Sequence, residues 1–304
     1  MYKKRINKAI EHGIDFLVEN QLDSGEFPTT AASTQQMNGG YLYNSPLVTS
    51  FVLYSIKGLR HSKLNKMTEK ALCFLLGEQE NGGIWRTHTK KNPYHRDLKL
   101  PPDLDDISAI SYILKLYGVP FDDNNDLIRN NLNGTNQYLT WIEPPFENEV
   151  DCVVNANVLL YLGENDPHIC SHINKVIREN LAFSRWYPDK LSFYYIVSRA
   201  FENGITSLGN NKVTIIGEIL SRQSIDGSFG NDLESAFALN ILHNFDFAGD
   251  AVETGTNYLI DKQNTDGSWN LCVFYSGFKM FYGSKALTTA LALEALKKYL
   301  HRTI

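Results

Sequence analysis

Three carboxylates stand within four residues of this chain, at Asp103, Asp105 and Asp106. Adjacent carboxyl groups that share one site cannot all ionise at low cost, so one of them keeps its proton. Two prolines precede the cluster and an apolar helical pattern begins at Ile107, which places the carboxyls at a helix start. The free backbone N–H groups there stabilise the negative charge left after a proton is given away. The residue types and their spacing therefore indicate a general acid.

The same residues also fit a structural role. Aspartate is favoured at the N-cap and in the first turn of a helix, because it accepts hydrogen bonds from free N–H groups and complements the helix dipole. A short acidic pattern also arises by chance. Which role applies depends on the elements that surround the cluster.

Four stretches of the chain share one pattern, in which a Gln is followed by a turn with Gly and then by an aromatic residue. The stretches are 21–27, 79–85, 223–229 and 263–269, the last reading Gln-Asn-Thr-Asp-Gly-Ser-Trp. The Gln amide can bond loose backbone groups at a helix end, and Gly permits the turn. The aromatic ring can pack against the neighbouring helix pair. The repeated unit is therefore helix, turn, helix.

Apolar periodicity predicts six such helix pairs. The outer helices are expected at 5–20, 63–78, 124–142, 167–182, 210–223 and 249–263. The inner helices are expected at 45–58, 103–117, 150–162, 190–202, 232–244 and 284–300. Uneven spacing, and two pairs that lack the Gln and Gly, favour a closed ring over an open array. The sequence thus predicts an all-α fold, an α6/α6 toroid of about twelve helices that forms a single domain over residues 1–304.

The repeat resembles that of the terpenoid cyclases and the protein prenyltransferase β subunits, which are α/α toroids. The resemblance covers nearly the whole chain, from Ile10 to Leu296. In this setting the acidic cluster resembles the D-x-D-D motif of class II terpene cyclases, which start cyclisation by protonating an isoprenoid. That likeness implies that Asp105 is the general acid and that Asp103 and Asp106 support it. The family commonly has Thr after the motif, whereas this chain has Ile107.

We therefore expect a class II terpene cyclase-like enzyme that acts on a prenyl diphosphate or a squalene-type polyene. Protonation itself needs no cofactor, and Mg²⁺ is expected only if the substrate carries a diphosphate. No metal-ligand residues are predicted. The residue that ends the reaction by removing a proton is not identified by the sequence.

Several residues are candidates for the wall of the cavity that a closed ring would enclose at the starts of its inner helices. Asn155 and Asn157 lie on an apolar helix, where each needs a polar partner: the acid cluster, or a helix carbonyl. Aromatic faces stabilise carbocations, although each aromatic candidate also fits plain core packing. These candidates are Tyr194, Tyr195, Phe237, Phe281 and Tyr282. The basic candidates for holding a diphosphate are His95, Arg96, Arg199, Lys279 and Lys285.

Composition limits the classes of partner and compartment. A net charge of −5 argues against nucleic acid as a ligand. The four cysteines have no C-x-x-C spacing and are expected to be reduced thiols. With no leader and no apolar run of membrane-spanning length, we expect a cytoplasmic protein that touches a membrane only peripherally, to collect an apolar substrate.

Three other functions stay open at this level. A prenyltransferase β-like subunit would need a zinc site with an Asp-x-Cys pair, whereas Asp151 and Cys152 are adjacent. A catalytically silent toroid could bind an isoprenoid or a protein, since the resembled cyclases usually add a second helical domain. A homodimer or a partner could otherwise close the cavity. A carbohydrate-active toroid could pair the acidic cluster with Glu149, Asp151 or Glu234.

Overall fold

The inner ring consists of six helices that are apolar on nearly every side. The structure, a computed structural model, describes residues 2–92, 100–144, 146–277 and 279–302. The inner helices are α2 (Pro46–Ile56), α5 (Leu104–Leu116), α7 (Cys152–Leu162), α9 (Lys190–Glu202), α11 (Asp232–Asn244) and α13 (Lys285–Arg302). Each packs against the next in this order, and α13 packs against α2, so the ring closes as predicted. Neighbours cover these helices on all sides, which explains why α7 is buried from its first residue to Tyr161.

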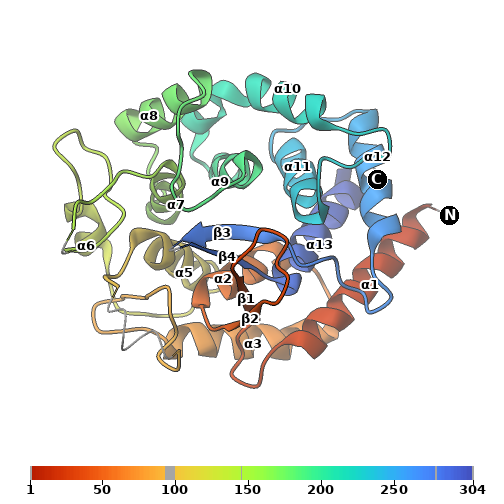
Figure 1. The fold of residues 1–304 in the computed structure, drawn as a ribbon, viewed down its shortest axis with the longest axis horizontal. Helices are drawn as coiled ribbons and strands as arrows, with labels where there is room; N and C mark the ends of the chain where they lie inside the picture. The colour runs from red at the N-terminus through yellow and green to blue at the C-terminus, as the bar shows by residue number, and fades with distance from the viewer. Residues whose placement is uncertain (1, 93–99, 145, 278, 303–304) are drawn as a thin grey trace.

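The outer helices are amphipathic and surround this ring (Figure 1). They are α1 (Tyr2–Asn20), α3 (Ser62–Gly77), α6 (Asn125–Asn130), α8 (Pro167–Arg178), α10 (Lys212–Arg222) and α12 (Asp250–Lys262), with the 3-10 helix η1 (Thr206–Asn211) before α10. The predicted helix over 124–142 is wrong beyond Asn130. The chain there forms antiparallel bridges between Leu132 and Tyr138 and between Leu139 and Val150. Asn and Gly crowd this segment, and both disfavour a helix interior.

The prediction of an all-α fold is also wrong in one respect, because a four-stranded antiparallel sheet is present. Its strands are β1 (Thr29–Ala32), β2 (Tyr41–Tyr43), β3 (Val273–Gly277) and β4 (Met280–Gly283), in the order β2-β1-β4-β3. β1 pairs with β4, with Thr30 opposite Gly283, so the sheet joins segments that are far apart in the sequence. In the view down the shortest axis the sheet lies inside the ring of helices (Figure 1).

Three of the four repeated Gln residues fasten neighbouring outer helices to one another, whereas Gln79 accepts from the Asp122 backbone N–H. The Gln263 amide donates to the Gly267 carbonyl of its own turn at 2.9 Å and to the Ala9 carbonyl of α1 at 2.8 Å. Gln21 and Gln223 make the corresponding pairs of bonds with their own turns and with α3 and α12. The predicted bond to a helix end is thus made to the next helix along the ring. Through Gln263, the last outer helix is bonded to the first.

The turn glycine makes this approach feasible. Gly267 has a φ of +86°, and a Cβ there would lie 2.2 Å from the His12 carbonyl oxygen of α1. No other residue type fits both the backbone angle and the space. The aromatic residue that follows is fully buried: the Trp269 indole N–H donates to the Leu259 carbonyl at 2.8 Å, and Trp85 bonds Leu75 in the same way at 2.7 Å.

No helix in the described part of the chain combines the length and apolar character that crossing a membrane requires.

Candidate active site

A cavity of about 340 Å³ lies between the sheet and the starts of α5 and α7. All three carboxylates of the acidic cluster line it, together with strand residues from both ends of the chain, among them Tyr43 and Tyr275. Its volume falls within the range typical of small-molecule sites. The position at which the sequence placed a general acid therefore faces a hollow in the structure.

Asp105 is held in this cavity by two hydrogen-bond donors. Its side chain is 9% exposed. Oδ1 accepts from the Asn157 amide at 2.6 Å, and Oδ2 accepts from the Tyr187 hydroxyl at 2.5 Å. Burial, reinforced by the charge of Asp103, raises the pKa of Asp105 to about 7, while the two hydrogen bonds oppose that rise. Asp105 thus keeps a proton near neutral pH, and both donors are in place for the carboxylate that remains after the proton leaves.

Asp103 and Asp106 form a tight pair behind it. Asp103 caps α5 by accepting the Asp106 backbone N–H at 2.8 Å, so the structural role weighed for the cluster applies to this residue. The Thr87 hydroxyl oxygen lies 3.0 Å from Asp103 Oδ2 and 2.8 Å from Asp106 Oδ2. One hydroxyl proton cannot serve both acceptors. Burial raises the pKa of Asp106 well above its usual value, which supplies the second proton that this arrangement needs.

Aromatic rings form much of the remaining wall. Tyr275 and Tyr282 stack with centroids 4.7 Å apart, and Tyr43 lies 4.7 Å from Tyr282. Trp141 and Trp186 meet edge to face at 5.5 Å on another part of the wall. The ring faces of such residues attract cations, and their bulk excludes water. Tyr282 was predicted near the cavity from the sequence, and the structure confirms that position.

A second hollow, which we call the vestibule, adjoins the cavity. It has a volume of about 650 Å³ and shares Trp141 and Trp186 with the cavity. The rest of its lining is Phe146, Glu147, Asn148, Glu149 and Arg185. Glu149 Oε1 accepts the indole N–H of Trp186 at 2.8 Å and of Trp141 at 3.3 Å, and so fixes both rings. The two indoles therefore line both the vestibule and the acid-bearing cavity.

Of the two candidate asparagines, the structure brings only Asn157 to the acid. Asn155 instead bonds the backbone N–H and carbonyl of Tyr138, each at 2.9 Å. It fastens the segment before α7 rather than contacting the acidic cluster. Each asparagine thus follows one of the two alternatives weighed for it: Asn157 bonds the acid, and Asn155 also donates to the Asp151 carbonyl at 2.8 Å.

Most of the other predicted wall residues lie elsewhere. The Tyr194 hydroxyl bonds Glu218 of α10 at 2.9 Å, outside the ring. Lys285 lies 3.5 Å from Asp266 and is half-buried, away from the cavity wall. Lys279 is exposed and Phe281 half-buried in the strand region, where neither contributes to the cavity wall. His95 and Arg96 fall outside the described residues.

Three further candidates are buried inside the ring. Tyr195 donates to Glu294 at 2.9 Å, and Phe237 packs 5.0 Å from the Tyr195 ring, so both belong to the core and not to the cavity wall. Arg199, predicted as a diphosphate ligand, is 2% exposed and donates to Asn157 at 2.5 Å. It contacts the support of the acid rather than the cavity.

Sequence reasoning missed Tyr187, Thr87 and the two indoles. Tyr187 lies 82 positions after Asp105, and no local pattern links them. The available signal was position: Trp186 and Tyr187 directly precede the predicted inner helix at 190–202, and the starts of the inner helices gather at one mouth. Bulky aromatics at such a start are candidates for the cavity wall.

Comparisons with known proteins establish the fold. No family model and no curated protein matches the sequence. Among solved structures, the type II terpene cyclase MstE from Scytonema has a TM-score of 0.74 at 14% identity, with 99% of each chain covered. A variant of MstE in complex with its substrate, geranylgeranyl dihydroxybenzoate, has a TM-score of 0.72.

Two other likenesses agree on the architecture. A protein from Actinoplanes has a TM-score of 0.73 at 15% identity, covering 97% of this chain and 99% of that one. A possible member of the GH105 family from Salmonella enterica has a TM-score of 0.58 at 11% identity, covering 100% of this chain and 96% of that one. At these identities the likeness extends to the fold and not to the activity.

Proposed function

We propose that this protein is a class II terpene cyclase-like enzyme and that Asp105 is its general acid. The observation that carries the proposal is that Asp105 is almost completely buried, lines an aromatic cavity and accepts hydrogen bonds from two donors. The Asp105 O–H proton passes to one carbon of the terminal alkene of the substrate. The π electrons of that alkene form the new C–H bond, and the electrons of the O–H bond stay on the carboxylate. A carbocation results, and Asn157 and Tyr187 stabilise the carboxylate left behind.

The cavity wall suits the later steps of such a reaction. Successive double bonds of the substrate attack the cation and close rings, and the last cation loses a proton to end the reaction. Stacked Tyr275 and Tyr282 present faces that stabilise the moving charge. Exclusion of water protects the cation from capture before the rings are complete.

The likeness to MstE supports the proposal as well. The resembled cyclases usually have a second helical domain, which favoured a silent binding protein as the alternative. MstE is a type II terpene cyclase whose chain is covered to 99% by this one. A cyclase of that type therefore exists at this extent, and the alternative loses its main argument.

We propose that the substrate is a polyprenyl chain on an aromatic or other head group that carries at most one negative charge. The chain would occupy the cavity and the head group the vestibule, beyond Trp141 and Trp186. Among the described residues, the vestibule carries two glutamates and one arginine, and Arg185 lies 3.8 Å from Glu149. This charge balance is unfavourable for a diphosphate. On this proposal proton transfer needs no cofactor and Mg²⁺ has no part in it.

A substrate panel tests the proposed function. Purified protein is incubated with farnesyl and geranylgeranyl diphosphate, squalene, oxidosqualene and geranylgeranyl dihydroxybenzoate, and products are identified by mass spectrometry and NMR. We expect a cyclised isomer from the prenylated aromatic compound, formed at least about tenfold faster than from either diphosphate. Binding without any cyclised product would support the silent toroid instead.

The pH dependence of turnover should report the acid. Asp105 must be protonated to act, and its pKa is raised to about 7. Activity is therefore expected below pH 7 and should fall tenfold per pH unit above it, until another step limits the rate. Initial rates of product formation between pH 5 and 9 check this, with circular dichroism at each pH as the control. A rate that rises through this range would assign the carboxyl a basic role.

The carbohydrate-active alternative gains no support from its predicted partner carboxylates. Glu234 forms a capping box with Asn231 at the start of α11, and Asp151 caps α7. Glu149 holds the two indoles. Each of these groups has a structural bond that accounts for its position.

A further inference from the structure

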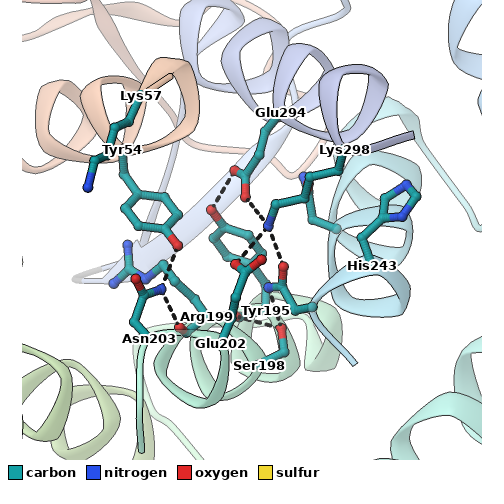
Figure 2. Close-up of polar contacts among 12 residues, drawn as sticks. Tyr54, Lys57, Tyr195, Ser198, Arg199, Glu202, Asn203, His243, Glu294 and Lys298 are labelled. Carbon is teal, nitrogen blue, oxygen red and sulfur yellow. Dashed lines mark hydrogen bonds and ion pairs between the residues drawn. The ribbon is translucent and has the colours of Figure 1, made fainter. Parts of the chain in front are cut away.

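Arg199 is a buried cation to which the reaction proposed above gives no role. It lies on α9 inside the ring, with its guanidinium 4.6 Å from the Phe51 ring centroid and 5.0 Å from that of Tyr54. Figure 2 shows it beside Tyr54 and Tyr195. A buried charge is costly without a polar partner. The partner here is Asn157, the residue that bonds the acid.

The bond from Arg199 determines which way the Asn157 amide faces. A guanidinium has only donors, so the atom that it meets at 2.5 Å must be the amide oxygen. The NH₂ end of Asn157 must then point the other way, where it lies 2.6 Å from Asp105 Oδ1. A flipped amide would place two donors against each other on one side and two oxygens on the other. Arg199 thus ensures that Asp105 always meets a donor at Oδ1.

An ion cluster lies near Arg199, next to Tyr195, whose ring centroid is 6.0 Å from the guanidinium. Glu294 accepts from Tyr195 at 2.9 Å and lies 2.9 Å from the Lys298 ammonium group. Lys298 also lies 2.9 Å from Glu202, as the dashed lines of Figure 2 show. Together with Arg199 these groups carry two positive and two negative charges. The charges of this layer therefore cancel, which offsets part of the cost of burying the arginine.

We propose that Arg199 is a positioning residue, which sets the acidity of Asp105 by fixing the orientation of the Asn157 amide. The orientation of the Asn157 amide exists without substrate. The role of Arg199 therefore rests on the proposed function only for the expected effect on turnover. Asp105 is thereby connected, through Asn157 and Arg199, to the buried interior of the ring.

The other groups that face Asp105 set the direction of the expected effect. Asp103 and Asp106 on α5 and Asp151 at the start of α7 are acidic and favour a protonated Asp105. Tyr187 and Asn157 are the donors that oppose them. Loss of a correctly oriented Asn157 should therefore raise the pKa of Asp105, because one of two bonds to the carboxylate is lost.

The test measures the pKa of Asp105 directly, in the full-length protein and without substrate. Carboxyl ¹³C NMR titration of aspartate-labelled protein provides it, with Asp105→Asn used to assign the signal. Arg199→Met removes the charge and the donors while keeping a long side chain. We expect it to raise the Asp105 pKa by about one unit. Arg199→Lys, which keeps a cation and a donor, should raise it by less than half as much.

A double-variant cycle separates positioning from a direct charge effect. Asn157→Leu should raise the Asp105 pKa by itself, and adding Arg199→Met should then change it by less than a third of its effect in the native background. Full additivity, or an unchanged pKa in Arg199→Met, would overturn the proposal. If Arg199→Met does not fold, the test is Asn157→Leu alone. An unchanged Asp105 pKa in that variant would also overturn the proposal.

Turnover is measured on the same variants to keep the two proposals separate. If the native protein cyclises no member of the substrate panel, the proposed function fails while the titration result for Arg199 stands. If the native protein cyclises a substrate and the titration shows no shift, only the role of Arg199 fails.

Discussion

Replacing Asp105 by asparagine is expected to lower cyclisation by about a thousandfold or more. Asparagine has nearly the same shape and can keep contacts with Asn157 and Tyr187, but it has no acidic proton to give. The fold should survive, because the change removes no packing volume. Product formation is measured by mass spectrometry, and helical content and thermal stability by circular dichroism.

Two matched variants sharpen this result. Asp126→Asn, on the exposed face of α6, should leave turnover unchanged. Asp106→Asn should retain part of the activity, because that residue supports the acid through Asp103 and Thr87. Wild-type turnover by Asp105→Asn would contradict the mechanism. If Asp106→Asn were inactive at the same time, the acid would be Asp106.

The largest loss of stability is expected from Trp269→Ala. The indole is fully buried between α12 and α13, and truncating such a side chain costs about 3–5 kcal/mol of the free energy of unfolding. The Leu259 carbonyl also loses its donor at 2.8 Å. Urea denaturation followed by circular dichroism measures the change.

The control for this prediction lies in another copy of the repeat. Ile225 occupies the turn between Gln223 and Phe229 and is fully exposed. Ile225→Ala should therefore change the free energy of unfolding by less than about 0.5 kcal/mol. Equal losses in the two variants would mean that the turn aromatic does not fasten the outer helices.

The inner helices were predictable because their apolar patterns are long and their caps are local. Asp151 and Asp189 each cap the helix that follows, within one or two residues of the predicted helix starts at 150 and 190. The sheet escaped prediction because its strands are short and pair across the whole chain, although Val273, Phe274 and Tyr275 are typical strand formers. The helix expected over 124–142 failed where Asn and Gly replace good helix formers.

Asp105 could be predicted as the acid of the site, but the residues that surround it could not. Asp105 and its neighbours are a local motif at a helix start. Tyr187 comes from a distant loop, and its approach to Asp105 depends on ring closure. Tyr195 and Phe237 were expected at the cavity because their helices start near it. Those helices are buried on every side. The sequence therefore has no amphipathic pattern to indicate which side of its helix each aromatic side chain lies on.

Closure of the ring also orders the events of biosynthesis. The bond between Gln263 and Ala9 joins residues 254 positions apart, and β1 waits for β4 to pair with it. A chain emerging from the ribosome therefore carries Asp105 long before Tyr275 and Tyr282 exist to cover it. The carboxyl can meet Asn157 and Tyr187 before then, but the cavity beside it is complete only when translation has delivered the final strands.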